Sequence, residues 1–549
     1  MKFSTPTFLS AFVMMCAAGL QAAPPKAPKL VVAILVDQLR YDYLDRFHSQ
    51  FVDGGFRELT DKGAFMTFAQ YNYYPTITAP GHASFFSGSP PMMHGVIAND
   101  WFDKRSGEMM YCVEDDSVKG VGTDAKEGQR SPRNFIGATV ADQMRLHWGS
   151  KVVGISVKDR GAILPAGKKP TGAYWFEAAS GNFITSTYYQ NELPGWVKAF
   201  NDSKRPDAFV GQTWERLLDA KQYPVPDEAA GEGHLAGEKG STFPHKVIKE
   251  EAEGYESILS TPFGNQLLME FAKAAIEGEG LGQGDKPDLL TVSFSSIDYC
   301  GHKFGPYSQE VQDITLRLDR QLKELFAYLD KKIGLANVVM VLTADHGVAP
   351  TPENAKEQGL DGERPNVTDM LVELQGKVAE RFGAGRYFLS AKGSLKPKLV
   401  EGNLYYDHAV LETNKVQPEA LTAFIREWAL SKEVFHAVYG RDQLLEGRAP
   451  GVIGQRIANG FNGERSGDAV LILKPWMISG TGKAATGTTH GSPFSYDTHI
   501  PIIFYGAPFK AGRYADEFSI TDLAPTLSAG LGIQEPPMCM GKPAVRVLK

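Results

Sequence analysis

Short runs of aliphatic and β-branched residues recur along the chain, separated by segments whose apolar residues repeat every three or four positions. The runs are Leu30 to Val36, Lys151 to Val157, Leu289 to Phe294, Val338 to Leu342 and Ile500 to Phe504. Continuous apolar runs of this length are typical of strands that are buried on both faces. The alternation therefore predicts an α/β fold with a sheet covered by helices on both sides.

A long amphipathic helix is predicted between the third and fourth runs. Its apolar residues, spaced three and four apart, are Val311, Ile314, Leu318, Leu322, Leu325 and Leu329. This spacing puts them on one face of a helix that crosses from one strand to the next. We interpret that face as ordinary core packing.

Two long stretches interrupt the alternation, at about residues 165–284 and 350–483. The first is rich in glycine, proline and charged residues, for example from Pro224 to Gly233. We interpret both as insertions between sheet elements and as candidates for a cap over a site. Residues 23–549 are then expected to form a single α/β domain that carries these insertions.

The charge balance excludes some classes of partner. The 549 residues include 57 Lys or Arg and 64 Asp or Glu, a formal charge of −7 that is spread along the chain. This distribution argues against nucleic acid as a dedicated partner. We expect a monomer.

The first 22 residues have the features of a secretory signal peptide. A positive charge at Lys2 precedes a largely apolar run over residues 8–20, which is too short to cross a bilayer, and Ala22 and Ala23 close a small-residue cleavage site. Cys16 lacks the small preceding residues that lipid attachment requires. We therefore expect a periplasmic or secreted protein.

The remaining sequence predicts neither a membrane span nor a disulfide scaffold. No other apolar stretch is long enough to cross a bilayer. The cysteines that remain are Cys112, Cys300 and Cys539, so at most one disulfide forms.

Polar residues cluster at the ends of the predicted strands, where open α/β sheets bind ligands. The residues concerned are Asp37, Lys158, Arg160, Asp298, His302, Asp345, His346 and, shortly before the last run, His490. A mixture of carboxylates and imidazoles suits Zn²⁺ better than Mg²⁺ or Ca²⁺. Three Asp and three His exceed the needs of one tetrahedral ion, so we expect two Zn²⁺ ions per chain.

Each of these residues also has an ordinary interpretation. An aspartate after a strand is often a helix N-cap, and the segment from Asp298 to His302 is compatible with a surface loop. Lys158-Asp-Arg160 alone would be a solvated turn. The recurrence of the same polar chemistry at every strand end favours a shared site.

The segment from Tyr74 to Gly88 contains a candidate nucleophile. Pro80 suits the first turn of a helix, which puts Thr78 at the positive N-terminal end, where an anion is favoured. A threonine hydroxyl attacks well only when its proton is removed or masked, as a neighbouring Zn²⁺ would do. Thr76 is the nearest alternative, and a helix-capping role for Thr78 is compatible with a nucleophilic one.

These motifs resemble those of the alkaline phosphatase superfamily. The matching segments are Asp37, Thr78 in Thr-x-Thr-x-Pro-x-His, Asp298-x-x-x-His302, Asp345-His346-Gly and Thr-His490-Gly. The sequence is most similar to the phosphate-irrepressible alkaline phosphatases, through Ile97-Ala-Asn99-Asp-Trp and Ser156-Val-Lys158-Asp-Arg160. The resemblance implies an α/β/α sandwich with a central, mostly parallel sheet and large insertions.

The resemblance also implies a role for each of the site residues. One zinc ion would be bound by Asp298, His302 and His490, and the other would be surrounded by Asp37, Asp345, His346 and Thr78. Asn99, Lys158 and Arg160 would hold the non-bridging oxygens of a phosphoryl group, whose transition state spreads charge over three oxygens. The Lys158 and Arg160 pair would replace the Mg²⁺ that other branches use.

The implied activity is hydrolysis of small phosphate monoesters. Thr78 attacks phosphorus to give a phosphothreonine intermediate, which water then hydrolyses to release inorganic phosphate. His82 and Cys300 have no role in this scheme.

Two other activities and one other class of protein remain as alternatives. A phosphodiesterase or nucleotide pyrophosphatase of the same superfamily comes first, although a diester has less need of a cationic pair. A sulfatase is disfavoured because no Cys or Ser has the required Pro-x-Arg context. A periplasmic phosphate- or metal-binding protein would have no use for Thr78 beside a metal.

Overall fold

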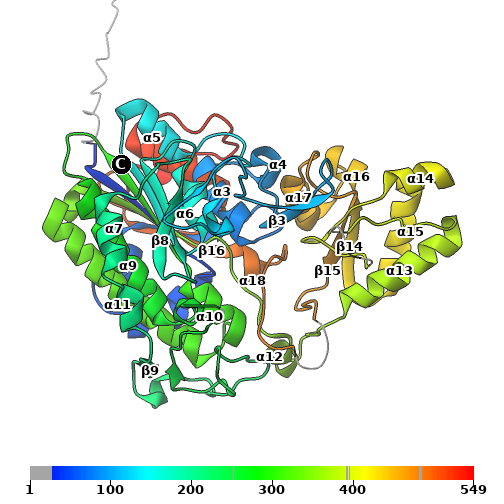
Figure 1. Ribbon diagram of the computed structural model, residues 1–549, viewed down its shortest axis with the longest axis horizontal. Helices are drawn as coiled ribbons and strands as arrows, with labels where there is room; N and C mark the ends of the chain where they lie inside the picture. The colour runs from blue at the N-terminus through cyan, green and yellow to red at the C-terminus, as the bar shows by residue number, and fades with distance from the viewer. Residues whose placement is uncertain (1–26, 252, 391–393, 395, 481–484) are drawn as a thin grey trace, which may run out of the picture.

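A central sheet of eleven strands organises the described part of the chain (Figure 1). The computed structural model describes residues 27–251, 253–390, 394, 396–480 and 485–549. Strand order is β17-β2-β16-β12-β1-β11-β6-β7-β8-β5, with β18 also paired to β2. The predicted signal peptide, residues 1–22, lies outside the described residues.

None of the three cysteines that the structure describes, Cys112, Cys300 and Cys539, forms a disulfide.

Each of the five apolar runs forms a strand of this sheet, which confirms the predicted α/β class. Their bounds are β1 Leu30–Val36, β6 Val152–Ser156, β11 Asp288–Phe294, β12 Val338–Thr343 and β16 His499–Tyr505. The other strands are β2 Ala64–Gln70, β5 Gly120–Val121, β7 Gly172–Glu177, β8 Asn182–Ser186, β17 Gly512–Tyr514 and β18 Phe518–Ser519.

The strand directions bring distant segments to one edge of the sheet. Strands β12, β1, β11, β6 and β7 run parallel, and Val36 is in register with Phe294 and Leu35 with Thr343. Their carboxyl ends therefore share an edge. Strand β16 runs antiparallel to both β12 and β2, so the loop that precedes β16 reaches this same edge.

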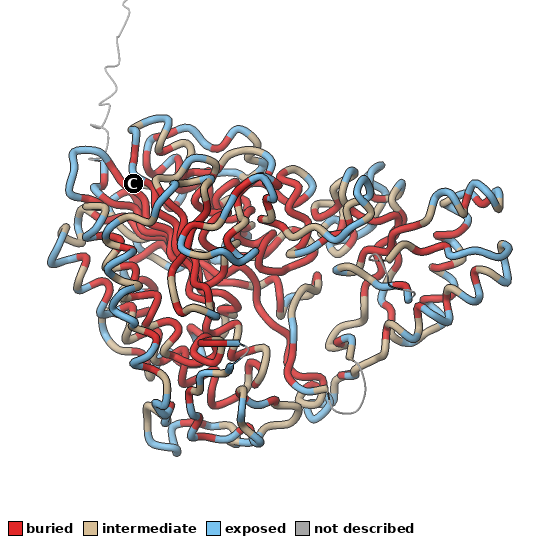
Figure 2. Tube along the Cα trace, viewed as in Figure 1, coloured by how far each residue is buried: buried red, intermediate tan, exposed pale blue. Residues whose placement is uncertain are grey.

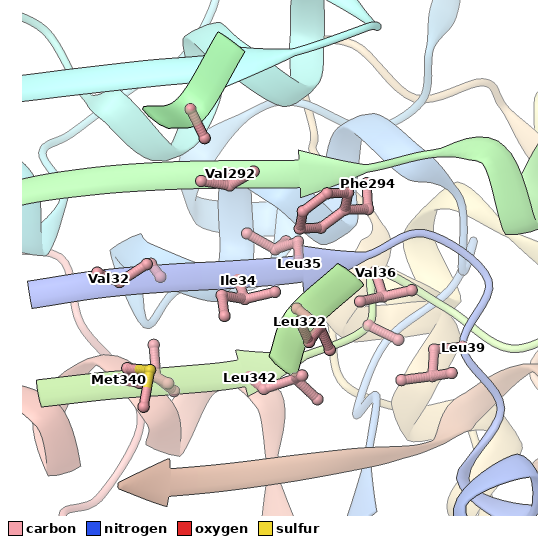
Figure 3. Packing of buried hydrophobic residues seen from close by; sticks show 14 of the residues in the cluster. Val32, Ile34, Leu35, Val36, Leu39, Val292, Phe294, Leu322, Met340 and Leu342 are labelled. Atoms are coloured by element: carbon pink, nitrogen blue, oxygen red, sulfur yellow. The ribbon is translucent and has the colours of Figure 1, made fainter. Parts of the chain in front are cut away.

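Helices cover both faces of the sheet, and buried residues are concentrated between them (Figures 1 and 2). On one face α9 Pro262–Glu279 packs against α11 Gln309–Ile333, and on the other α3 Thr78–Ser87, α5 Val140–Trp148 and α6 Asp159–Ala166 pack together. The six predicted apolar residues of α11 are all buried, and Leu322 lies over β1 and β12 in Figure 3. The crossover helix is thereby confirmed.

Further helices and strands complete the main body. They are α1 Tyr41–Arg46, α2 Phe56–Lys62, α4 Pro91–His94, β3 Asp100–Asp103, β4 Glu108–Tyr111, α7 Gly195–Asp202, α8 Glu256–Leu259, α10 Ser296–Phe304, α12 Pro352–Glu357, α18 Ser495–Thr498 and α19 Leu523–Leu531. None of the helices in the described ranges is long and apolar enough to cross a membrane.

Residues 165–284 include part of the core as well as an outer segment. Strands β7 and β8 extend the central sheet and α9 covers it, whereas β9 Thr213–Trp214 and β10 His245–Lys246 form a separate pair outside. Strand β7 consists mainly of glycine and aromatic residues rather than of the aliphatic residues that mark the other runs. The sequence pattern therefore assigned this strand to an insertion. A capping role for the outer segment stays a prediction.

The described residues between 350 and 480 mostly form a smaller lobe with its own apolar core, at the right of Figure 1. Its sheet has the order β13 Asn403–Leu404, β15 Ala469–Leu473, β14 Phe435–Gly440. Its helices are α13 Val367–Phe382, α14 His408–Asn414, α15 Pro418–Ser431, α16 Arg441–Leu445 and α17 Gly451–Gly460. In sequence the lobe separates His346 from His490. That it caps the site stays a prediction.

Candidate active site

One group of possible metal ligands is built on α10. Asp298 and His302 lie one turn apart on this helix and face His490, which comes from the loop before α18. His302 Nε2 is 3.3 Å and His490 Nε2 is 3.6 Å from Asp298 Oδ1. Ligand atoms of the three residues lie within 4.8 Å of one another, a spacing that fits one metal ion.

A second group lies at the ends of β1 and β12. Asp37 follows β1, and Asp345 and His346 follow β12; all three are fully buried. His346 Nε2 is 3.2 Å from Asp345 Oδ2, and the His346 ring stacks on His490 of the first group with 3.4 Å between centroids. Ligand atoms of Asp37, His82 and Asp345 lie within 4.8 Å of one another, and His346 adjoins this group through Asp345. The structure thus brings the six predicted Asp and His residues together at one edge of the sheet.

The hydrogen bonds of the histidines fit metal binding. In His302, His346 and His490, Nδ1 lies 2.9 Å from a backbone carbonyl oxygen. Donation from Nδ1 leaves a lone pair on Nε2, which is the usual arrangement in a metal-bound histidine. His346 Nε2 and Oδ2 of both Asp37 and Asp345 are buried and make no well-aligned hydrogen bond with the described residues, although Lys158 lies 3.1 Å from Asp37 Oδ2. A bound metal would satisfy these atoms.

His82 lies in the second group although the scheme predicted from the sequence gives it no role. Its nitrogens lie within 3.6 Å of Asp37 and Asp345. However, Nδ1 is 2.9 Å from the Thr78 carbonyl oxygen and Nε2 is 2.8 Å from Ser293 Oγ, which donates to Asp37. Because both ring nitrogens are engaged, His82 links the Thr78 segment to Asp37. In the sequence, the spacing of four residues between Thr78 and His82 was the signal that could have indicated this link.

Thr78 is the first residue of α3 and is only 2% exposed. The side chain of Asn99 accepts a hydrogen bond of 2.9 Å from the Ala79 N–H, so Asn99, rather than Thr78, caps this end of the helix. A methyl group on Gly81 would lie 2.5 Å from the Asp345 carbonyl oxygen, so glycine permits the close approach of α3 to the second group. Thr76, the alternative nucleophile, donates its hydroxyl to the Ser492 carbonyl.

Lys158 is buried between the two groups. Its ammonium is 2.5 Å from Asp298 Oδ2 and 3.1 Å from Asp37 Oδ2. Burial alone would lower the pKa of Lys158, but the carboxylates of Asp298 and Asp37 outweigh burial and hold the pKa above its usual value. Burial likewise would raise the pKa of Asp298, but Lys158 and His302 hold it well below its usual range.

Arg160 is positioned by residues that belong to none of the motifs found in the sequence. Its Nη1 donates to the hydroxyl of Tyr111 at 3.0 Å, and that hydroxyl donates to Asp159 Oδ1 at 2.5 Å. Arg130 Nε donates to Asp159 Oδ2 at 2.8 Å. The position of Asp159 between Lys158 and Arg160 was a signal for this network, but Tyr111 and Arg130 are distant in sequence.

Gln38 contacts both metal groups. Its backbone N–H donates to Asp345 Oδ1 at 3.1 Å, and its Nε2 donates to Asp298 Oδ1 at 2.7 Å. Gln38 is fully buried and has a left-handed backbone, with φ of 65°. A side chain on Gly301 would collide with Gln38, so the glycine leaves room for this contact.

The fold and the site define a known class of protein. The family model for type I phosphodiesterase / nucleotide pyrophosphatase matches residues 31–493, and the chain belongs to this family. It is 41% identical to alkaline phosphatase PafA of Elizabethkingia meningoseptica, over 95% of this chain and 94% of PafA. It is 38% identical to alkaline phosphatase PhoV of Synechococcus elongatus, over 95% and 93% of the two chains.

A Myroides odoratus protein named calcium-transporting ATPase is 38% identical over 99% of both chains. The crystal structure of wild-type PafA matches with a TM-score of 0.89 and 40% identity, covering 95% of this chain and 99% of PafA. The predicted alkaline-phosphatase-like fold is thereby confirmed.

Proposed function

We propose that this protein is an alkaline phosphatase that hydrolyses small phosphate monoesters with two zinc ions per chain. The observation that carries the proposal is the pair of adjoining Asp and His groups beside Thr78 at the start of α3. Full-length similarity to the alkaline phosphatases PafA and PhoV supports the same activity. The ions would be held by Asp298, His302 and His490 and by Asp37, Asp345, His346 and Thr78.

The chain's own residues would carry out two displacements. Bound zinc would favour the alkoxide form of Thr78 and neutralise charge on the departing oxygen. Thr78 Oγ attacks phosphorus as the bond to the alcohol oxygen breaks, and the alcohol leaves with a proton from water. Water then attacks the phosphothreonine, which releases inorganic phosphate and restores the Thr78 hydroxyl. Two in-line displacements retain configuration at phosphorus.

The phosphoryl oxygens need positive charge that Thr78 cannot supply. Lys158 contributes a point charge, Arg160 a planar pair of donors and Asn99 a neutral hydrogen bond. These three residues stabilise the dianion of a monoester more than the singly charged diester. The family also contains phosphodiesterases and nucleotide pyrophosphatases, so diester hydrolysis is the alternative; a kcat/KM that is higher for diesters than for monoesters would favour it.

The decisive experiment is turnover of a generic aryl phosphate by purified protein loaded with zinc. Repeated release of the coloured alcohol is expected from the enzyme. A phosphate- or metal-binding protein would bind the ester or its product without turnover, and that outcome would overturn the proposal.

We also propose that the protein is exported to the periplasm or secreted, and acts as a monomer. The sequence of residues 1–22 supports export. Cell fractionation together with the mass of the mature protein tests both statements, since a cytoplasmic, uncleaved chain or a stable dimer would contradict them.

A further inference from the structure

A cavity of about 300 Å³ lies where the lobe meets the loop that carries His490. One wall comes from the main body and includes Tyr74, His490 and Tyr496. The opposite wall comes from the lobe and includes Leu371 of α13, Lys474 after β15, and Met477. His490 is therefore shared between this cavity and the first metal group.

The two walls are tied together by hydrogen bonds of the aromatic rings. Tyr74 donates its hydroxyl to the Glu401 carbonyl oxygen at 3.2 Å. Tyr496 accepts a hydrogen bond of 3.2 Å from the Trp476 N–H. Because each bond joins the main body to the lobe, the space between them has a defined shape in the folded protein.

We propose that this cavity binds the alcohol portion of the substrate, and that it selects monoesters of ring-containing alcohols. The inference rests on the proposed function. In an in-line displacement the departing oxygen lies on the side of phosphorus opposite the nucleophile. With Thr78 attacking from one side, the alcohol emerges beside Asp298, His302 and His490, and of these three His490 lines the cavity.

The lining of the cavity indicates the chemistry of the alcohol. Aliphatic side chains from the lobe and the rings of Tyr74 and Tyr496 supply the apolar part of a mixed lining, which suits a flat ring system. The charged lining residues are Lys398, Lys474 and Glu401, which leaves an excess of one positive charge. This excess favours a ring that carries a negatively charged substituent.

Filling the cavity tests the inference. Met477 is only partly buried and belongs to none of the hydrophobic core clusters, so Met477→Trp should fold. We expect kcat/KM for 1-naphthyl phosphate to fall at least about tenfold relative to wild type, and kcat/KM for methyl phosphate to stay within about twofold. Met540→Trp, at a methionine that is 53% exposed, is the matched control and should leave both values unchanged.

The outcomes separate the inference from the proposed function. Equal losses on both esters in Met477→Trp would overturn the inference, whereas failure of wild-type protein to cleave either ester would overturn the proposed function. A second variant, Lys474→Glu, changes charge without filling space. It should lower kcat/KM for carboxylated phenyl phosphate about threefold more than for phenyl phosphate, and an unchanged ratio would contradict the charged part of the inference.

Discussion

Thr78 is the first residue of α3, and the first-turn N–H of Ala79 is bonded by the side chain of Asn99 rather than by Thr78. Thr78→Ala should fold and retain zinc but lose monoester turnover by roughly a thousandfold or more, since it removes the hydroxyl that forms the covalent intermediate. Thr78→Ser should keep part of the rate. Steady-state kinetics and mass spectrometry of acid-quenched enzyme measure both effects. Phosphate trapped on Thr76 would instead show that Thr76, and not Thr78, is the nucleophile.

Lys158 and Arg160 are cations beside the metal groups, and in the metal-free site Asp298 and Asp37 outweigh burial and hold the pKa of Lys158 above its usual value. Replacing both Lys158 and Arg160 with Ala should therefore hurt monoesters, which are dianions, more than diesters. Each such donor is typically worth about 3 kcal/mol in a desolvated site. The monoester to diester ratio of kcat/KM should fall at least roughly tenfold. Equal losses would mean that the pair only maintains the architecture of the site.

Gln38 is a positioning residue that donates to a carboxylate of each metal group. Gln38→Ala removes the bond to Asp298, so we expect zinc to be bound roughly tenfold more weakly or worse. Competition with a chelator of known affinity measures this effect independently of turnover. Gln455→Ala, at an exposed glutamine of α17, is the control. Unchanged zinc affinity in Gln38→Ala would show that its contacts are dispensable.

At the scale of elements, β10 is joined to α11 through His245, which lies between Glu238 and Glu310. Burial lowers the pKa of His245, but the two carboxylates outweigh burial and raise it from 6.5 to about 9. Protonated His245 therefore contributes fully to the free energy of unfolding below pH 6.5, and this contribution is lost as pH rises through about 9. Burial raises the pKa of Glu232 to about 8. Deprotonation of this buried carboxyl also lowers the stability of the folded state as pH rises.

The β9 and β10 pair should accordingly loosen between pH 7 and pH 10. Amide hydrogen exchange in these strands, corrected for the intrinsic effect of pH, should become faster, and the Tm should fall. His245→Gln should reduce this pH dependence, whereas His408→Gln, at an exposed histidine, should not. An equally steep pH dependence in His245→Gln would contradict the assignment.

At the scale of the whole molecule, the two metal groups join segments from distant parts of the chain. Asp37, Asp298 and Asp345 are buried carboxylates, and Lys158 balances part of their charge. Removing the metal should therefore abolish turnover and also lower the Tm, by roughly 5 °C or more. Zn²⁺ should restore both better than Mg²⁺ because imidazole ligands favour zinc. Full activity in protein shown to be metal-free would overturn the metal assignment.

The sequence by itself determined the elements that carry the site. Uninterrupted apolar runs predicted β1, β11, β12 and β16 because strands buried on both faces need no polar alternation. The polar residues after these runs, with the superfamily motifs, also predicted the six Asp and His residues of the two groups. Both signals are local, so a single sequence contains them.

Only the tertiary structure decided the direction of β16, the contacts around the site and the cavity beside the lobe. The antiparallel direction of β16 places His490 at the shared edge, and no local pattern distinguishes it from a parallel strand. Gln38 and Asp298 lie 260 positions apart, and Tyr111 of β4 meets Arg160 of α6. Such contacts depend on how separate elements pack, whereas hydropathy reports only whether each residue is buried.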